Sequence, residues 1–358
     1  MKVFAVILII LVLAAVCGIG YLYLSANLDV RFVSCIATDA VSQVETFDSL
    51  KEKLIAAAQD AELVFIPGRE ISDSLLAEAD AVIGNLPPSR LAVARYLKWI
   101  QLGSAGADGY TAPGVLPEGA VLTNASGAYG LAISEHMIAC LLFLMKNLGQ
   151  YAADQAEHVW QDRGPVSSIW NSRTLVVGLG DIGGEFAQKM HALGSRVTGI
   201  RRHEAPKPDY LEALCQLDRF YDCLKEADVV ASCLPGTKDT RRLYDRDAFA
   251  AMKEGAYFLN VGRGSSVDSL ALADALNSGH LAGASVDVTD PEPLPADHPL
   301  WNARNILITP HISGGDHLRE TQERIAGIAA DNLNRFVTGR ELRNVVDPAL
   351  GYRRFEGS

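Results

Sequence analysis

A glycine-rich turn lies near the middle of the chain and reads Val176-Val177-Gly178-Leu179-Gly180-Asp181-Ile182-Gly183. An apolar run at 174–178 predicts a strand before it, and an amphipathic run at 182–193 predicts a helix after it. In such a G-x-G-x-x-G pattern the first glycine permits a tight turn. The second admits a pyrophosphate close to the backbone, and the third lets helix and strand pack closely. The motif therefore predicts a dinucleotide site at the N–H donors of the helix start. Its expected residues are Gly178, Gly180, Asp181, Ile182 and Gly183.

Strands and helices alternate on both sides of this turn. From residue 174 onward, strands are predicted at 174–178, 196–200, 228–234, 256–261, 282–288 and 305–309, with helices between them. Before it, strands are predicted at 30–36, 63–66, 81–83, 99–102 and 119–124, with helices at 50–59, 72–79 and 90–97. A long helix is expected at 131–157 and a closing helix at 319–337. This alternation predicts an α/β protein with parallel sheets, and the six later strands complete a dinucleotide fold.

The end of the second strand after the turn bears on which dinucleotide binds. Many NAD-binding folds place Asp or Glu about 20 residues after the motif, where it holds the ribose 2′-hydroxyl. Here Arg201 and Arg202 stand at that strand end, and Glu204 comes only later. Two guanidinium groups suit a 2′-phosphate dianion. NADP(H) is therefore expected in preference to NAD(H), although a solvated basic turn would have the same sequence.

Three chemically active residues follow later strands of the same block. Arg263 comes after the strand at 256–261, Glu292 after the strand at 282–288, and His311 after the strand at 305–309. The carboxyl ends of parallel strands share one edge of a sheet, which is where ligands bind in open α/β folds. Each residue alone could be a surface charge, a loop residue or a core histidine. Together, behind a dinucleotide motif, they predict a catalytic set.

Seven short stretches of the sequence, three of which contain Arg263, Glu292 and His311, are considered together with the glycine-rich turn. They are Gly103-Ser104-Ala105-Gly106-Ala107-Asp108, Leu122-Thr123-Asn124, Ser134-Glu135-His136, Asn260-Val261-Gly262-Arg263-Gly264, Ser285-Val286-Asp287-Val288, Glu292-Pro293-Leu294-Pro295 and Thr309-Pro310-His311-Ile312-Ser313-Gly314. With the glycine-rich turn, this set resembles the D-isomer-specific 2-hydroxyacid dehydrogenase family over about residues 28–348. The arginine pair at 201–202 stands where the family commonly has an acidic residue, and in this the chain resembles the glyoxylate/hydroxypyruvate reductase-like branches of that family.

The resemblance implies an NAD(P)-dependent oxidoreductase that interconverts a small 2-oxo acid and a D-2-hydroxy acid. His311 resembles the acid/base at the C2 oxygen, Glu292 its partner, and Arg263 the residue that binds the substrate carboxylate and polarises the 2-oxo group. The backbone of Ser104, Ala105 and Gly106 matches the loop that holds the same carboxylate. Asp287 matches a position near the nicotinamide, Leu234 and Pro235 match the adenine-side wall, and Val261 and Gly262 are counted with the dinucleotide-binding residues.

Length and charge limit the classes of function. The chain has 358 residues, enough for two domains, and a net charge of −11. Phosphate binding requires a basic face, so this charge argues against a nucleic-acid partner. The six cysteines are scattered without a CxxC pair or a Cys/His cluster. Neither a disulfide framework nor a metal site is therefore expected.

The N-terminal residues form a separate apolar segment. Residues 3–24 carry no charged side chain, and a helix of that length spans about 33 Å, enough for a bilayer core of roughly 30 Å. An uncleaved transmembrane helix is therefore expected, with a signal peptide or a buried segment as alternatives. Because reduced nicotinamide dinucleotides are kept inside the cell, the catalytic region is expected on the cytoplasmic side.

The expected organisation has four segments. They are a membrane anchor at 1–26, the first part of a substrate domain at 27–127, a Rossmann NAD(P)-binding domain at 128–315, and a return segment with tail at 316–358. The resemblance implies that the Rossmann domain is inserted into a flavodoxin-like substrate domain, and that the protein is a homodimer. The alternative hypothesis is an interaction protein that senses nicotinamide dinucleotides on the same fold. A turnover assay separates the two.

Overall fold

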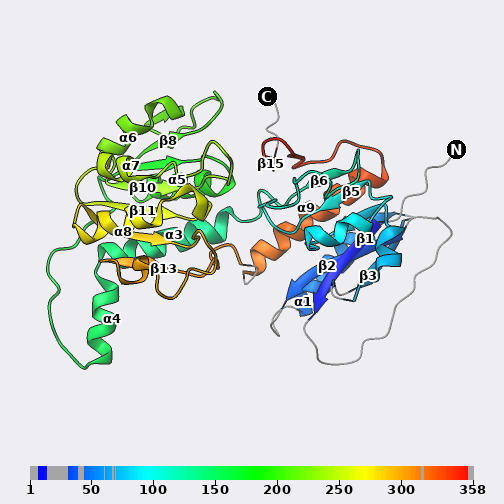
Figure 1. Ribbon diagram of the computed structural model, residues 1–358, viewed down its shortest axis with the longest axis horizontal. Coiled ribbons are helices and arrows are strands. Elements are labelled where there is room, and N and C mark those ends of the chain that lie inside the picture. Colours follow the sequence, from blue (N-terminus) through cyan, green and yellow to red (C-terminus); the bar gives the residue numbers. More distant parts are fainter. Residues whose placement is uncertain are drawn as a thin grey trace. The chain divides into compact units, whose positions relative to one another are not determined.

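The chain divides into two compact units in its computed structural model, which describes residues 7–13, 31–38, 44–59, 61–66, 68, 70–315 and 318–353. Unit 1 combines Met1–Ala128 with Asp316–Ser358, and unit 2 is Tyr129–Gly315. Unit 2 is thus inserted between two segments of unit 1 along the chain (Figure 1).

Unit 2 is built on a seven-stranded sheet whose neighbouring strands are all parallel. The strand order is β13-β12-β11-β10-β7-β8-β9, so the chain runs outward in both directions from the β7–β10 pair, as in doubly wound dinucleotide folds. The strands are β7 (Arg173–Val177), β8 (Arg196–Ile200), β9 (Ala213–Cys215), β10 (Val229–Ser232), β11 (Ala256–Asn260), β12 (Leu281–Val286) and β13 (Ile306–Ile308). The helices are α3 (Gly130–Met145), α4 (Leu148–Ala156), α5 (Asp181–Ala192), α6 (Phe220–Glu226), α7 (Arg246–Ala251) and α8 (Ser269–Asn277).

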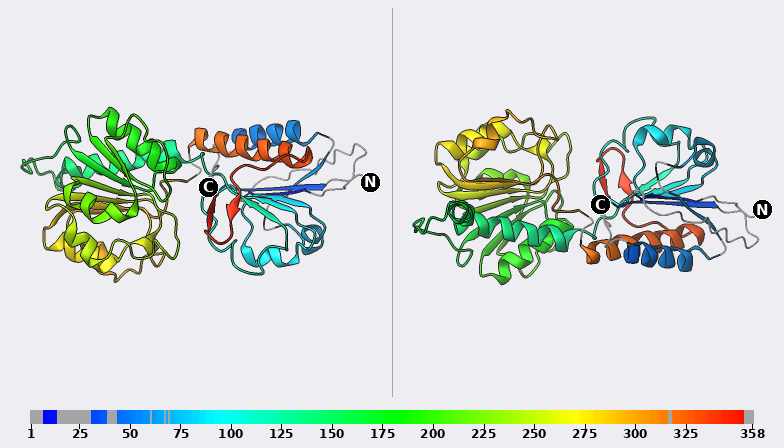
Figure 2. Two further views of the ribbon diagram at one scale, coloured as in Figure 1. Left: turned by 90° about the horizontal axis from the view of Figure 1, so that it is seen from above. Right: turned by 90° about the horizontal axis from the view of Figure 1, so that it is seen from below.

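Helices cover both faces of this sheet, with α6, α7 and α8 on one side and α3 and α5 on the other (Figure 2). The central strands β10 and β11 are buried along their whole length, which explains why they are apolar up to Ser232 and Asn260 at their carboxyl ends. An aromatic cluster joins α6 and α7 to the sheet, with neighbouring ring centroids 4.9–6.3 Å apart; its members are Phe220, Tyr244, Phe249 and Phe258. Each such buried phenylalanine stabilises the fold by roughly 1.5–3 kcal/mol.

Two details of unit 2 differ from the sequence prediction. Strand β9 was not predicted, because Ala213-Leu214-Cys215 stands between Glu212 and Gln216 in a mixed apolar and polar stretch without a clear period. The single helix expected at 131–157 is two helices, α3 and α4, whose axes differ by 70°. Asn147 between them has φ +56°, a left-handed conformation that cannot continue a helix.

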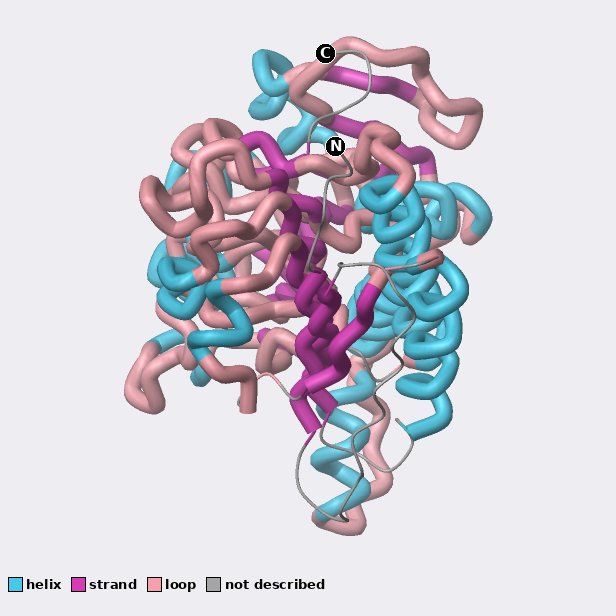
Figure 3. The backbone as a smooth tube through the Cα atoms, turned by 90° about the vertical axis from the view of Figure 1, so that its right-hand side faces the viewer, coloured by secondary structure: helices cyan, strands magenta, loops and turns pink. Residues whose placement is uncertain are grey.

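Unit 1 contains a six-stranded parallel sheet in the order β1-β3-β2-β4-β5-β6, in which β1 also pairs with β2 and β4 (Figure 3). Its strands are β1 (Ile7–Leu13), β2 (Arg31–Thr38), β3 (Glu62–Ile66), β4 (Ala81–Ile83), β5 (Trp99–Gln101) and β6 (Val121–Thr123). Its helices are α1 (Val44–Ala58), α2 (Asp73–Ala77), a 3-10 helix (Pro88–Val93) and α9 (Arg319–Val337). A short antiparallel pair, β14 (Val346–Asp347) and β15 (Tyr352–Arg353), follows α9.

Helices α1 and α9 lie side by side on one face of this sheet, although they come from opposite ends of the chain (Figure 2). Trp99 of β5 is fully buried beneath them and stacks on Phe336 of α9 at 5.2 Å. A second buried cluster around Leu76, Leu91 and Leu122 covers the other face. The 3-10 helix replaces the α-helix expected at 90–97.

The prediction of a transmembrane helix over residues 3–24 needs correction. The part of this segment that the structure describes, Ile7–Leu13, is strand β1 and pairs in parallel with β2, β3 and β4. An unbroken run of Ile, Leu and Val suits a buried parallel strand as well as a helix, so periodicity alone could not separate the two. The rest of the segment lies outside the described residues. Among the residues searched, no single helix is long and apolar enough to span a membrane.

Candidate active site

Three glycines shape the turn between β7 and α5. Gly178 has φ +97°, and a Cβ there would lie 2.7 Å from the Cys233 carbonyl oxygen. A Cβ on Gly183 would lie 1.9 Å from the Gly178 carbonyl oxygen, so glycine is required for α5 to start this close to β7. At Gly180, no described atom lies within 4 Å of a Cβ position. The tight turn, the close packing and an open backbone position are therefore all present.

The ends of β10 and β11 meet the same turn. A Cβ on Gly262 would lie 2.5 Å from the Leu234 carbonyl oxygen, and one on Gly178 would lie 3.3 Å from the Leu234 nitrogen. Gly178, Leu234 and Gly262 thus come together at the carboxyl edge of the sheet, with Pro235 and Val261 beside them in the chain. Open backbone next to a helix N-terminus fits the pyrophosphate of a dinucleotide.

Asp181, in the first turn of α5, makes hydrogen bonds to the start of α3 that the sequence did not indicate. Its Oδ2 accepts hydrogen bonds from the backbone nitrogens of Tyr129 at 3.2 Å and Gly130 at 3.0 Å, at the start of α3. A Cβ on Gly130 would lie 2.6 Å from Asp181 Oδ1. The carboxylate therefore caps α3 and holds it close to α5.

The two arginines after β8 have different surroundings. The Arg201 nitrogen donates to the Cys215 carbonyl at 3.1 Å, which keeps this residue at the strand end, and its side chain is partly buried. Arg202 is exposed, and its guanidinium lies 3.1 Å from Asp239 Oδ2. Because Arg201 is the residue fixed at the strand end, it is the stronger candidate for a 2′-phosphate.

His311 and Glu292 form a hydrogen-bonded pair beyond β12 and β13. The His311 Nδ1 lies 2.9 Å from Glu292 Oε2, and both side chains are partly exposed, at 51% and 39%. The other carboxylate oxygen of Glu292 accepts from the Thr289 nitrogen at 2.9 Å, which fixes the direction of the carboxylate. Because a carboxylate only accepts, Nδ1 carries a proton toward Glu292 and Nε2 faces away from it.

The segment with Arg263 reaches the same loop. Arg263 follows β11, and its carbonyl accepts from Asn260 Nδ2 and Ser266 Oγ. A Cβ on the next residue, Gly264, would lie 2.0 Å from the Thr289 backbone, so the Arg263 and Glu292 segments are packed backbone to backbone. The structure therefore gathers the three predicted catalytic residues at one edge of the unit 2 sheet.

Asp287 is buried and holds the loop that carries His311. Its Oδ1 accepts from Thr309 Oγ1 at 2.6 Å and the Ile312 nitrogen at 3.0 Å, and its Oδ2 accepts from the nitrogen and hydroxyl of Ser313. Its carbonyl also accepts from the His311 nitrogen at 2.8 Å. Burial opposes ionisation, but the hydroxyl and backbone donors outweigh it and lower the pKa of this carboxyl. Asp287 is thus an ionised anchor whose two oxygens already have protein donors.

His136 of α3 extends this network, and the sequence assigned it no role. Its Nε2 lies 3.3 Å from Thr309 Oγ1 and 3.3 Å from Cys140 Sγ. Burial raises the pKa of the Cys140 thiol, which keeps the thiol protonated. His136 could have been singled out from the sequence, because the stretch Ser134-Glu135-His136 is part of the family resemblance.

The predicted substrate loop belongs to unit 1 and is well fixed there. Ser104 Oγ donates to the Gly106 carbonyl at 2.7 Å, Asn124 Nδ2 donates to the Ala105 carbonyl at 2.7 Å, and the Ala125 nitrogen donates to the Ser104 carbonyl at 2.9 Å. With the carbonyl oxygens engaged, the loop conformation is set by unit 1 itself.

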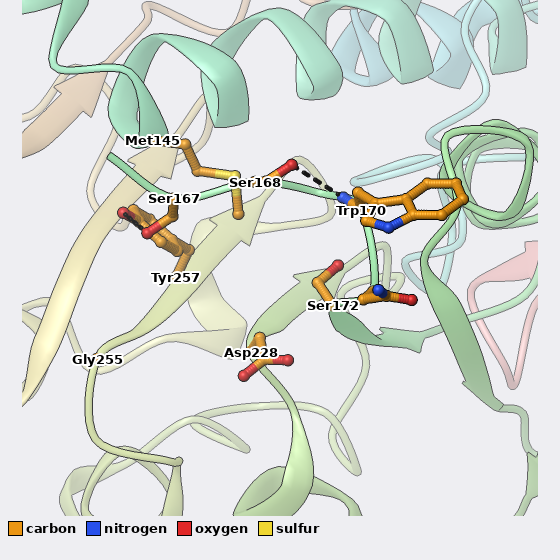
Figure 4. A pocket seen from close by; sticks show the side chains of 9 residues that line it. Met145, Ser167, Ser168, Trp170, Ser172, Asp228, Gly255 and Tyr257 are labelled. Carbon is orange, nitrogen blue, oxygen red and sulfur yellow. Dashed lines mark hydrogen bonds between the residues drawn. The ribbon is translucent and has the colours of Figure 1, made fainter. Parts of the chain in front are cut away.

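A cavity of about 330 Å³ lies at the opposite edge of the unit 2 sheet (Figure 4). It is lined by Met145, Ser167, Ser168, Trp170, Asn171, Ser172, Asp228, Gly255 and Tyr257. Ser172, Asp228 and Gly255 directly precede β7, β10 and β11, whereas the predicted catalytic residues follow the strands. The cavity is therefore separate from the candidate site. Among the residues searched, no group of three or more His, Cys, Asp or Glu side chains is placed to hold a metal.

Comparisons with known proteins identify the family of the chain. Residues 138–313 match the model of the D-isomer specific 2-hydroxyacid dehydrogenase NAD-binding domain. The chain is 30% identical over 320 residues to glyoxylate/hydroxypyruvate reductase B of Yersinia pestis, covering 86% of this chain and 91% of that protein.

Solved structures give the same result. A D-isomer specific 2-hydroxyacid dehydrogenase family protein from Aeromonas salmonicida has a TM-score of 0.75 and 31% identity, covering 84% of this chain and 96% of that one. NADPH-dependent glyoxylate/hydroxypyruvate reductase from Sinorhizobium meliloti, solved with NADP and sulfate, has a TM-score of 0.71 and 27% identity, covering 84% and 96%. The chain therefore belongs to the D-isomer specific 2-hydroxyacid dehydrogenase family, the NAD(P)-dependent oxidoreductases that act on CH–OH groups.

Proposed function

We propose that the protein interconverts a small 2-oxo acid and the corresponding D-2-hydroxy acid, acting mainly as a reductase with NADP(H). The observation that carries this proposal is the 2.9 Å pair of His311 and Glu292 at the carboxyl edge of a dinucleotide-binding sheet. A bound nicotinamide dinucleotide supplies or accepts the hydride at C2. The chain must then move a proton at the C2 oxygen.

The geometry of the pair supports His311 as the group that moves this proton. Its Nδ1 proton faces Glu292, so Nε2 is the nitrogen that exchanges a proton with the C2 oxygen. During oxidation of the hydroxy acid the imidazole gains a proton, and the carboxylate of Glu292 stabilises the resulting cation. Glu292 thus fixes both the ring orientation and the tautomer.

Arg263 is proposed to bind the substrate carboxylate and polarise the 2-oxo group, because a guanidinium forms paired hydrogen bonds to a carboxylate. Arg263→Ala is therefore expected to abolish turnover while the dinucleotide still binds, as measured by steady-state kinetics and by fluorescence titration with NADPH. Retained turnover would remove this assignment. The expectation that the backbone of residues 104–106 holds the same carboxylate stays a prediction.

Names of relatives support the substrate and dinucleotide classes. A relative named glyoxylate/hydroxypyruvate reductase and a structural neighbour described as NADPH-dependent favour short 2-oxo acids and NADP(H). The test is oxidation of NADPH and NADH by the full chain with glyoxylate, hydroxypyruvate, pyruvate and longer 2-oxo acids. Faster turnover with NADPH is expected. Equal or faster turnover with NADH would overturn the dinucleotide preference but not the reaction.

A homodimer is part of the proposal, supported by an apolar surface on unit 2. Helix α4 extends away from the sheet of its unit (Figure 1). Large exposed apolar side chains lie on α4 and on the segment that follows it, up to residue 170. They are Leu148, Tyr151, Val159, Trp160, Val166 and Trp170. Arg163 Nε bonds Asp154 Oδ2 at 2.6 Å and holds the segment against α4. Such an apolar surface suits contact with a second copy of the chain.

Light scattering with size-exclusion chromatography tests the dimer. The mass of a dimer is expected, and the mass of a monomer would contradict the proposed homodimer.

The location in the cell stays a prediction. We propose a cytoplasmic catalytic region, since reduced dinucleotides are kept inside the cell. Cell fractionation tests this location. The protein is expected in the cytoplasmic fraction, and recovery in a secreted or extracytoplasmic fraction would contradict it.

A further inference from the structure

The imidazole of His136 lies directly behind the loop that carries His311. His136 comes from α3, on the face of the sheet opposite α6 to α8, and is partly buried. Its Nε2 is 3.3 Å from the hydroxyl of Thr309, and this hydroxyl is 2.6 Å from Asp287 Oδ1. A continuous chain of polar contacts therefore links α3 to the acid/base loop through one threonine.

The hydrogen-bond directions in this chain can be assigned from the donors alone. The lowered pKa of Asp287 leaves it an ionised acceptor, so the single proton of the Thr309 hydroxyl goes to its carboxylate. The Thr309 oxygen can then only accept from His136, so Nε2 of His136 carries a proton. The sulfur of Cys140, also 3.3 Å from Nε2, faces this N–H as a second, weaker acceptor.

The loop that carries His311 depends on hydrogen bonds to the residues around it. His311 has φ +54°, a left-handed conformation that a residue with a side chain adopts only where its surroundings enforce it. Asp287 enforces it through bonds from Thr309, His311, Ile312 and Ser313. Two of these donors are hydroxyls that can rotate, those of Thr309 and Ser313, and the Thr309 oxygen has a second contact, with Nε2 of His136.

We propose that His136 is a positioning residue for the reaction: its Nε2–H directs the Thr309 hydroxyl onto Asp287 and so fixes the loop that presents His311. The inference rests on the proposed function of His311. His136 does not itself touch the reacting atoms. Its removal is expected to affect the rate of the chemical step more than binding of either ligand.

Three replacements at position 136 separate this role from simple packing. His136→Gln places an amide N–H where Nε2 stands, His136→Asn places one where Nδ1 stands, and His136→Leu keeps volume without a donor. We expect His136→Gln to retain kcat within about 3-fold and the other two to lose about 10-fold, the scale of a modest misplacement of a catalytic group. KM for the 2-oxo acid and the dissociation constant of NADPH are expected to change less than kcat. If His136→Leu retains kcat, or if His136→Gln is no better than His136→Asn, the proposal fails.

A double-mutant cycle with Thr309→Val tests the route of the effect. If His136 acts through the Thr309 hydroxyl, the double variant His136→Leu/Thr309→Val has a kcat no lower than that of Thr309→Val alone. Additive losses would overturn the proposed route. Thermal unfolding of each variant identifies any that fail to fold.

A third measurement is independent of turnover. Nitrogen-15 NMR of histidine-labelled protein is expected to show His136 with a protonated Nε2, and Thr309→Val is expected to shift this signal. An unprotonated Nε2 would overturn the proposal even in an active enzyme. If no 2-oxo acid is reduced but Nε2 is protonated, it is the proposed function that fails and not the hydrogen-bond network.

Discussion

At the scale of single residues, the site depends on carboxylates that orient other groups. Glu292 directs Nδ1 of His311, and Asp287 gathers the donors of the loop around it. Asp181 caps α3. Motifs in the sequence identified all three residues, but only the three-dimensional structure separates the partner of a histidine from a loop anchor and a helix cap.

The acid/base assignment makes a direct prediction at this scale. His311→Asn removes the group that exchanges the proton while keeping a small polar side chain, so kcat is expected to fall at least ~10²-fold, the usual effect of losing general acid–base catalysis. The control is binding of NADPH, which is expected to be unchanged. Near-wild-type kinetics in steady-state assays would rule out His311 as the acid/base.

The two arginines after β8 offer a matched pair for testing dinucleotide choice. Arg201→Asp is expected to shift the ratio of kcat/KM values from NADPH toward NADH, because a carboxylate repels the 2′-phosphate and can accept from a ribose hydroxyl. Arg202→Asp is the control, since Arg202 already faces Asp239. The same ratio in wild type and Arg201→Asp would show that Arg201 does not contact the 2′-phosphate.

Asp287 gives a pH-dependent prediction. Its pKa is lowered in the folded chain, so its contribution to stability is present above the unfolded pKa of about 3.9 and is lost as pH falls through the folded value. Asp287→Asn, which leaves donors facing an amide, is expected to cost about 1–3 kcal/mol at pH 7. Thermal unfolding from pH 7 down to pH 3 should show the gap to wild type shrinking below about pH 4. A gap that is independent of pH would contradict an ionised Asp287.

At the scale of elements, α3 and α5 are held together at their N-terminal ends. The Asp181 carboxylate caps α3, and Gly130 leaves room for the close approach. Asp181→Ala is expected to destabilise the chain by about 0.5–2 kcal/mol, the usual effect of losing a cap, whereas Asp181→Asn keeps an acceptor and loses less. Chemical denaturation measures both. Equal stability of all three proteins would show that the cap contributes nothing.

Prediction from sequence succeeded for elements with strong patterns. The six strands expected from residue 174 onward are present as β7, β8, β10, β11, β12 and β13, and α9 has the predicted bounds 319–337. It failed where the signal was short or ambiguous. The residues of β9 stood in a mixed apolar and polar stretch without a clear period, Asn147 broke a helix whose composition was continuous, and the apolar residues 7–13 suited a strand as well as a helix.

At the scale of the whole molecule, the sequence predicted which residues gather better than how they interact. Parallel strands bring their carboxyl ends to one edge, so Arg263, Glu292 and His311 could be placed together from their positions alone. Their contacts could not be read in the same way. The Asp287 anchor, and its link through Thr309 to His136, join residues up to 173 positions apart, and only tertiary packing sets such contacts.

The most direct test of the account is the configuration of the product. The purified full chain is incubated with NADPH and the 2-oxo acid that it reduces fastest, glyoxylate excepted because its product is achiral. The hydroxy acid formed is then resolved by chiral chromatography. The account predicts the D-enantiomer alone, formed in an amount equal to the NADPH consumed. Formation of the L-enantiomer, or no reduction of any 2-oxo acid by a chain that binds NADPH, would contradict it.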